Sequence, residues 1–278
     1  MGDPTVEKVS LYHPEIEGLG STYGSYIKNE FFSKFVDRHN IKTVLEYPID
    51  PYYEIAGTGS LIFATKGCNV TLLSPFEERL EKARQLWNEY GLSAYLRTVK
   101  SDLTTVPFGS AKFDLVWNEY VIQNLEADFN TKPADCIREM VRISRKFVLI
   151  ITSNRLNYGF PIHKASCLLR GSKSKFGSSR WMKGKPIRNI LTELGIKKIE
   201  EGMIDIPPFP SFDALGFVRK VRGAFTKPEK PLEAKKSDAE IIKMMEKYSF
   251  IERSSLPNIL KIFFAHAVYV LGEKLRTF

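Results

Sequence analysis

Apolar segments of strand length alternate with segments of helical spacing along the first half of the chain. Five segments have the composition of strands: Ile41–Glu46, Asn69–Leu73, Ala94–Val99, Phe113–Trp117 and Lys146–Thr152. Helical spacing separates several of them, as in residues 77–90 and 133–143. The last of these strands has a continuous apolar core, which is typical of a parallel strand covered on both faces. The alternation predicts an α/β fold with a doubly wound, mostly parallel sheet.

The second half of the chain breaks this alternation. Two helical segments, 164–169 and 186–194, precede a predicted strand at Ile196–Ile206. The Pro-rich and Lys-rich residues that follow contain one more helical pattern, at 238–247. We interpret the chain as one domain, 1–278. Its predicted parts are an N-terminal helical lid (about 1–40), a core (about 41–206), an insertion before the last strand (about 207–257) and a final strand (about 258–272).

The composition is that of a folded intracellular protein. The chain has 278 residues, of which 43% are hydrophobic and 26% charged, enough for one large α/β domain with an insertion. Cys68, Cys136 and Cys167 are widely spaced and form no metal or redox pattern, so we expect unpaired thiols and no metal site. The N-terminus lacks a secretion signal and residues 258–272 are too short to span a bilayer, so the sequence predicts a cytoplasmic protein without a transmembrane segment.

Polar or glycine residues follow four of the predicted strands. In a doubly wound sheet a ligand binds at the carboxyl ends of the strands, so these residues are the candidate site. Glu46 precedes a turn of Gly57, Thr58 and Gly59, where glycine lets the backbone approach a ligand. The other stations are Ser74-Pro75-Phe76, Asp102-Leu103 and Asn118. A tight turn at 57–59, helix-favouring glutamates after Phe76 and a turn-capping Asp102 are the structural alternatives.

These four stations, in this order, resemble the motifs of the class I S-adenosylmethionine-dependent methyltransferases between about Ile41 and Asn154. The resemblance implies a Rossmann-like, seven-stranded sheet whose last strand is antiparallel, with S-adenosylmethionine as cofactor. It also implies that Glu46 approaches the methionine amino group and that Gly57 to Gly59 line the cofactor. Ser74 would then face the ribose, and Asp102 with Leu103 the adenine.

Two features depart from the family pattern. Residues 47–56 separate Glu46 from its glycine turn, where the family has almost none, and they could form a longer lip over the cofactor. Ser74 replaces the acidic residue that usually binds the ribose hydroxyls. The leading hypothesis is methyl transfer to a small-molecule or anionic acceptor. A catalytically inactive binding or regulatory protein with the same fold is the alternative. A nicotinamide-dependent oxidoreductase is disfavoured, because the turn lacks a third glycine and follows its strand too late.

The acceptor side of the site is less defined by the sequence. The insertion at 207–257 is the first candidate for the substrate wall, and Tyr23 to Tyr26 could fold over the cofactor, with Tyr26 as a contact. His163, Asn118, Glu119 and Tyr120 are candidate bases, but methyl transfer depends mainly on alignment, so no catalytic residue is assigned.

Basic residues gather in two runs, at 170–188 and 219–236, and the net charge is +9. Such runs suit anionic partners in general. The simplest interpretation is that the two runs are solvated loops, and binding to an acidic lipid surface is another. RNA methylation is a secondary hypothesis, because Phe176 and Trp181 accompany the first run and aromatic rings can stack on bases. The sequence does not determine the oligomeric state.

Overall fold

A computed structural model describes residues 10–12, 14–49, 55–169, 177–209 and 237–274 of the chain. Its seven strands are β1 (Thr43–Glu46), β2 (Asn69–Ser74), β3 (Leu96–Lys100), β4 (Phe113–Glu119), β5 (Ser144–Ser153), β6 (Lys198–Ile204) and β7 (Ala267–Glu273). They form one sheet in the order β3-β2-β1-β4-β5-β7-β6. Only β7 is antiparallel to its neighbours, β5 and β6. The predicted fold class, with an antiparallel last strand, is confirmed.

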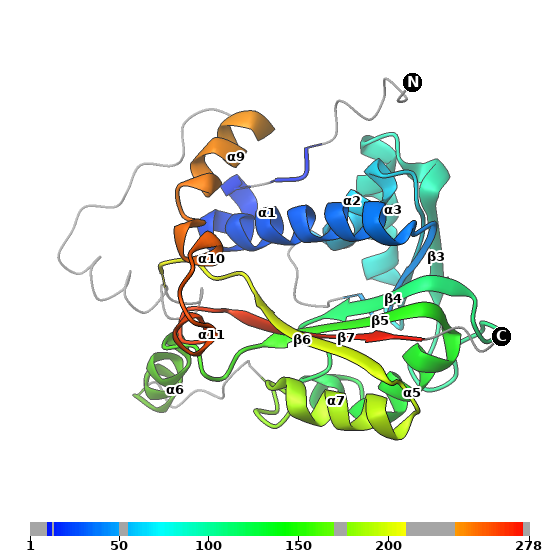
Figure 1. Cartoon of the computed structure of the whole chain (residues 1–278). Helices are drawn as coiled ribbons and strands as arrows, with labels where there is room; N and C mark the ends of the chain where they lie inside the picture. The colour runs from blue at the N-terminus through cyan, green and yellow to red at the C-terminus, as the bar shows by residue number, and fades with distance from the viewer. Residues whose placement is uncertain (1–9, 13, 50–54, 170–176, 210–236, 275–278) are drawn as a thin grey trace.

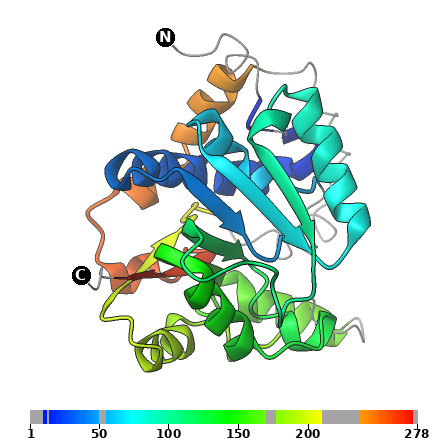
Figure 2. The same ribbon diagram turned by 90° about the vertical axis from the view of Figure 1, so that its right-hand side faces the viewer.

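Helices cover both faces of the sheet (Figures 1 and 2). The longer α-helices are α1 (Pro14–His39), α3 (Glu77–Glu89), α5 (Pro133–Ile143), α6 (Gly159–Leu169), α7 (Gly184–Glu193) and α9 (Asp238–Glu246). The short ones are α2 (Leu61–Thr65), α4 (Leu125–Asp128), α10 (Phe250–Arg253) and α11 (Asn258–Lys261), with 3-10 turns η2 (Thr58–Ser60) and η3 (Ser93–Tyr95). In Figure 1 the layer of α1, α2 and α3 lies above the sheet, and α5 and α7 lie below it.

Adjacent strand residues face opposite layers. Val44, for example, packs in the core with α1, α2 and α3, whereas its neighbour Leu45 packs in the core with α5 and α7. This follows from the two-residue period of a strand. Because both faces are buried, every position of β4 is buried, as expected for the centre of a parallel sheet.

Two predicted boundaries are corrected by the structure. The final strand begins at Ala267 instead of about 258, because β6 ends at Ile204, the partner of Ala267, and Asp205 then turns away with φ of 65°. Residues 258–261 form α11 instead. Ser93–Tyr95 is a 3-10 turn that precedes β3. The first helix begins at Pro14 and kinks at Gly18. No helix among the described residues is long and apolar enough to cross a membrane.

The described part of the predicted insertion packs on the N-terminal helix layer. Ser237 and Glu240 form a capping box at the start of α9. The carboxylate of Asp238 accepts hydrogen bonds from Ser10 Oγ at 2.7 Å and from the backbone N–H of Leu11 at 3.0 Å. Residues 210–236, including all of the second basic run, lie outside the described residues.

Candidate functional site

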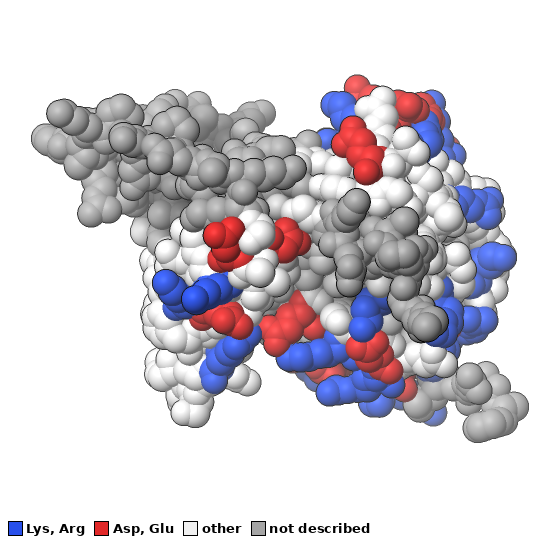
Figure 3. Space-filling view, turned by 90° about the horizontal axis from the view of Figure 1, so that it is seen from above, with Lys and Arg blue, Asp and Glu red and all other residues white. Residues whose placement is uncertain are grey.

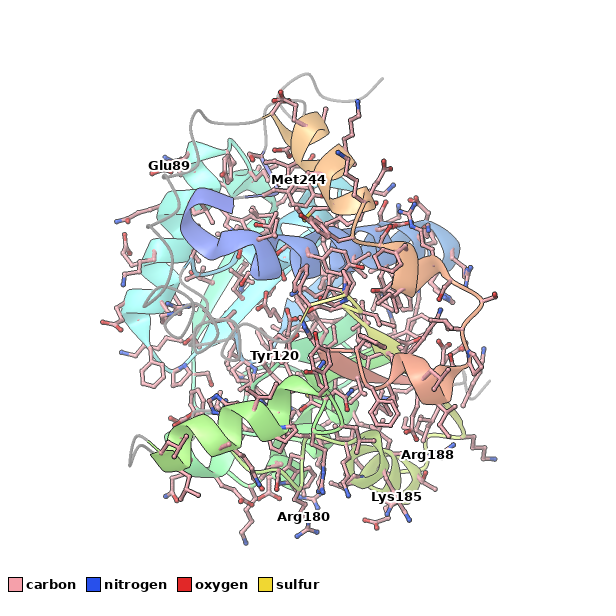
Figure 4. The ribbon with its side chains drawn as sticks, turned by 90° about the vertical axis from the view of Figure 1, so that its left-hand side faces the viewer. Glu89, Tyr120, Arg180, Lys185, Arg188 and Met244 are labelled. Carbon is pink, nitrogen blue, oxygen red and sulfur yellow. The ribbon has the colours of Figure 1, made fainter. Side chains whose placement is uncertain are left out.

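The parallel strands bring the predicted stations to one edge of the sheet. Glu46 ends β1, Ser74 ends β2 and Glu119 ends β4, and these three strands are neighbours with the same direction. Figure 4 looks onto this edge, with Tyr120, the residue after β4, near its centre, between α1 and α6. The candidate site is therefore the carboxyl edge of β2, β1 and β4.

The glycine turn is held rigidly against α3. Gly57 has φ of 80°, which favours glycine, and a methyl group there would lie 2.9 Å from the Cβ of Ala83. The indole N–H of Trp87 donates to the carbonyl of Gly57 at 3.0 Å. A methyl group on Gly59 would lie 3.2 Å from the ring of Trp117. Packing therefore constrains both glycines, and backbone geometry constrains Gly57 as well.

Glu46 lies beside this turn, as the resemblance implies. Its side chain is buried, and Ser60, one residue past the second glycine, donates its hydroxyl to Glu46 Oε2 at 2.6 Å. Ser60 was missed by the motif analysis, although its place directly after Gly57-Thr58-Gly59 is a usable signal. The charge-assisted hydrogen bond joins the end of β1 to the turn.

The start of the interruption, residues 47–49, is buried beneath the edge. The hydroxyl of Tyr47 donates to the carbonyl of Leu103, and the backbone N–H of Ile49 donates to the carbonyl of Leu73 at 3.0 Å. Burial raises the pKa of Tyr47, so this phenol stays protonated. The segment therefore ties the end of β1 to β2 and to the residues that follow β3. The remainder of the predicted lip, 50–54, lies outside the described residues.

Ser74 and its neighbours divide into buried and open positions. Ser74 is 2% exposed, and its Oγ accepts a hydrogen bond from the backbone N–H of Phe76 at 3.1 Å. Pro75 is half-buried, whereas Phe76 is 41% exposed and its ring centroid lies 5.6 Å from that of Phe129. Glu77 pairs with Arg84 at 2.6 Å. The serine hydroxyl thus stabilises the start of α3, and the exposed surface at this station is aromatic.

The remaining predicted residues also separate by exposure. Asp102 is exposed, and Leu103 is buried with its carbonyl bound by Tyr47. Asn118 is fully buried, and its Nδ2 donates to the carbonyl of Tyr47 at 3.0 Å. Its Oδ1 has no hydrogen-bond partner among the described residues. Asn118 is therefore an interior residue that supports the edge from below.

Tyr26 contacts the C-terminal helices. Its hydroxyl accepts a hydrogen bond from Arg253 Nη2 at 2.7 Å, and its ring packs against Tyr12 and Tyr23 with centroids 6.5 Å apart in each case. These contacts fix α1 to α10. The role of Tyr26 over the cofactor stays a prediction.

A buried ion pair lies between α1 and the end of β4. Lys28 Nζ lies 2.6 and 2.8 Å from the two carboxylate oxygens of Glu119, and both side chains are buried. Burial lowers the pKa of Lys28, but the charge of Glu119 outweighs it and raises that pKa above its usual value. Lys28 lies in the segment predicted only as a lid, and no spacing pattern marked it. Tyr120 follows Glu119 with φ of 55°.

A second polar group joins the ends of β6, β7 and α10. Asp205 Oδ2 lies 3.3 Å from His266 Nδ1, and His266 Nε2 lies 3.1 Å from the carbonyl of Phe209. Burial lowers the pKa of His266, but the charge of Asp205 outweighs burial and raises the pKa. Both partner atoms, a carboxylate oxygen and a carbonyl oxygen, are hydrogen-bond acceptors. Glu252 accepts hydrogen bonds from the Ile206 N–H at 2.6 Å and from the Tyr23 hydroxyl at 3.3 Å.

Burial raises the pKa of Glu252 to about 7. The other oxygen of its neighbour, Asp205 Oδ1, is buried without a hydrogen-bond partner among the described residues. Sequence reasoning missed this group because its members come from four distant segments of the chain. Charged residues with perturbed pKa values beside a ligand edge are typical of functional sites.

Two further predictions concern single side chains. His163 is buried within α6, 3.3 Å from Cys167 Sγ one helical turn away, so its contacts are internal. All three cysteines are buried and free, as expected. The described residues contain no group of three His, Cys, Asp or Glu side chains that could hold a metal. Trp181 is also buried, with Arg180 over its ring, so the first basic run presents no free indole for base stacking.

Comparisons with known proteins agree with this geometry. Residues 55–151 match the family model described as methyltransferase domain. A proposed sarcosine dimethylglycine methyltransferase from Galdieria sulphuraria has a similar structure, with a TM-score of 0.52 and 11% identity over 99% of this chain and 91% of that one. The YcgJ protein of Bacillus subtilis has a TM-score of 0.51 and 14% identity over 90% and 98% of the two chains. No curated protein matches the sequence.

These findings define the class of protein that the chain resembles. Residues 55–151 match the methyltransferase domain model, which confirms the resemblance to the class I S-adenosylmethionine-dependent methyltransferases, and the two structures share the fold. The matched region begins near the end of the interruption, after Glu46 and β1, and includes the glycine turn, β2, β3, β4 and most of β5.

Proposed function

We propose that the chain is a methyltransferase that binds S-adenosylmethionine at the carboxyl edge of β2, β1 and β4 and methylates a small-molecule acceptor. The observation that carries the proposal is the hydrogen bond from Ser60 to Glu46 beside the glycine turn, at the start of the region that matches a methyltransferase domain. A carboxylate that is already oriented beside a tight glycine turn suits the methionine end of this cofactor.

The exposed residues of the edge suit the nucleoside end. Phe76 offers an open aromatic face after β2, and Asp102 offers an exposed carboxylate after β3, the neighbouring strand. An aromatic ring can stack on adenine, and a carboxylate can accept from its amino group. The donor set therefore fits the cofactor at both ends, although the hydroxyl of Ser74 is buried where a ribose ligand is usual.

The chemistry requires alignment more than acid or base groups. The cofactor supplies an electrophilic methyl group when it is bound. The chain positions the acceptor nucleophile in line with that methyl group and excludes water from the site. Our candidate for the acceptor side is the region around Tyr120. The Lys28–Glu119 pair and the group of Asp205, His266 and Glu252 lie in this region, and their polar side chains border α1 and the described insertion.

Calorimetric titration tests the cofactor proposal. We expect both S-adenosylmethionine and S-adenosylhomocysteine to bind the full chain. Phe76→Ala and Asp102→Asn should each weaken binding by about tenfold, the value of one lost stacking or charged hydrogen-bond contact. Gln85→Ala, at an exposed position of α3, is the control and should bind as the wild type does. Absence of heat with both ligands at millimolar concentration would contradict the proposal.

A binding protein without turnover is the second candidate, and the internal hydrogen bond of Ser74 favours it. Cofactor binding combined with no formation of S-adenosylhomocysteine across small-molecule and RNA acceptor pools would support this candidate. An RNA acceptor would instead give binding that falls steeply with salt, because phosphate contacts release counterions.

A further inference from the structure

The exposed large apolar side chains of this protein are concentrated on one face. Nine such side chains are exposed among the described residues, and eight of them belong to two segments, 156–169 and 250–263. They are Leu156, Leu168, Leu169, Phe250, Leu256, Ile259, Leu260 and Phe263. We call this set the apolar face. Leu168 is 84% exposed and Ile259 is 74% exposed. Single exposed apolar side chains are common on protein surfaces, but a group of them marks an interaction site.

The two segments lie side by side. The backbone N–H of Tyr158 donates to the carbonyl of Phe263 at 2.9 Å, and Asn154 Nδ2 donates to the carbonyl of Ile262 at 2.6 Å. The rings of Tyr158 and Phe264 pack edge to face with centroids 5.7 Å apart. In Figure 1 both α6 and α11 lie on the left-hand side of the molecule, and Figure 4 looks onto this face. The apolar face is therefore one continuous part of the carboxyl edge.

The charged residues next to this face are mainly basic. Residues 154–192 contain no Asp or Glu, and neither do residues 253–272. The described part of the first segment holds six basic residues: Arg155, Lys164, Arg180, Lys183, Lys185 and Arg188. Arg180, Lys183 and Lys185 are exposed, and Figure 4 shows Arg180, Lys185 and Arg188 along the border below α6 and α11.

Other parts of the surface are different. The face that Figure 3 shows carries acidic and basic side chains next to each other. On α3, Arg84 pairs with both Glu77 and Glu81. Of the basic side chains named in Figure 4, Arg188 has an acidic partner, Glu201, and remains 55% exposed. Excess positive charge is thus a property of the apolar face and its border.

We infer that this face docks on an anionic lipid bilayer, with the leucine, isoleucine and phenylalanine side chains in the interfacial region and the lysine and arginine side chains on lipid phosphates. Aliphatic side chains gain free energy from contact with acyl chains, and basic residues next to them are attracted to an anionic surface. Nucleic acid would use the charge but gains little from exposed leucine and isoleucine, because bases stack on aromatic rings. The inference is independent of the proposed function, although docking would turn the carboxyl edge of the sheet toward the bilayer.

Vesicle sedimentation with the full chain tests the inference. Vesicles of phosphatidylcholine alone are compared with vesicles that contain phosphatidylglycerol as well. We expect binding to the anionic vesicles, weaker binding at high salt, and a loss on the order of tenfold or more for Leu168→Glu/Ile259→Glu. Gln85→Glu/Ala94→Glu adds the same charge at exposed positions of α3 and η3 and should bind as the wild type does. Both substituted pairs are exposed, so thermal unfolding should report folded protein for each variant.

Three outcomes would overturn the inference. The first is absence of binding to anionic vesicles. The second is equal binding by the wild type and Leu168→Glu/Ile259→Glu, which would assign the binding to charge elsewhere. The third is a lipid-free dimer that Leu168→Glu/Ile259→Glu converts to monomer in light scattering, because a second copy of the chain would then cover the apolar face.

Discussion

Replacing Glu252 by Gln should remove a loss of stability that the wild type suffers as the pH rises. The buried carboxyl has a pKa of about 7 in the folded chain against 4.5 for the ordinary group. Between these values the folded state keeps a proton that the unfolded state has released. Unfolding then releases a proton, so the free energy of unfolding falls as the pH rises from about 4.5 to about 7.

The magnitude follows from the difference of about 7 minus 4.5, or roughly 2.5 pKa units. At about 1.4 kcal/mol per unit this is about 3 kcal/mol. Glutamine keeps an oxygen for the Ile206 N–H, which donates at 2.6 Å in the wild type, and it carries no charge to desolvate. We therefore expect Glu252→Gln to match the wild type near pH 4.5 and to exceed it by up to about 3 kcal/mol at pH 8.

Chemical denaturation at several pH values, followed by the fluorescence of the buried tryptophans, measures this difference. His266 adds a pH dependence of the same sign, since Asp205 raises its pKa and its stabilisation is lost as the pH rises through that raised value. That contribution is present in both proteins and largely cancels. Glu89→Gln, at an exposed position of α3, is the matched control. Parallel stability curves for Glu252→Gln and the wild type from pH 5 to pH 8 would refute the reasoning.

Three more predictions concern the frame of the site. Gly57→Ala should lower the free energy of unfolding by about 2 kcal/mol or more, and Gly67→Ala should lower it by about 1 kcal/mol. Both glycines have a positive φ, but only a methyl group at position 57 would have neighbours within 4 Å, so equal losses in urea denaturation would contradict this reasoning. Lys28→Met should lower the free energy of unfolding by about 3–5 kcal/mol, because it leaves Glu119 buried without its ion-pair partner. The double variant Lys28→Met/Glu119→Leu should recover most of this loss, and no recovery would argue against a buried pair. Burial raises the pKa of Asp114, but hydrogen bonds, led by the one from Arg145, outweigh burial and lower the pKa to about 2. The ionised carboxylate therefore stabilises the fold by about 2 kcal/mol above pH 3.8, and this stabilisation is lost as the pH falls toward 2. Asp114→Asn should make the free energy of unfolding depend less on pH in this range.

The sequence by itself determined the order of the elements and which strand ends share the edge proposed as the site. The pattern 147–151 predicted a buried parallel strand, and β5 pairs with β4 in that direction. Glu46 and the turn at Gly57 were placed together by strand and glycine signals, and they lie together in the structure. These features are local, because side-chain period and glycine geometry act over a few residues.

Only the tertiary structure decided which side chains meet across the edge. Lys28 and Glu119 are 91 residues apart in the chain, and Asp205 and His266 are 61 apart. The start of β7 at Ala267 depended on where β6 ends, and no local signal in 258–266 marks it. The position of Ser74 at the end of β2 was predictable from the sequence. The direction of its hydroxyl was not, because burial and the hydrogen bond from the backbone N–H of Phe76 set it. Such contacts are fixed by packing between segments that are distant in the chain, and a pattern of neighbouring residues carries no information about that packing.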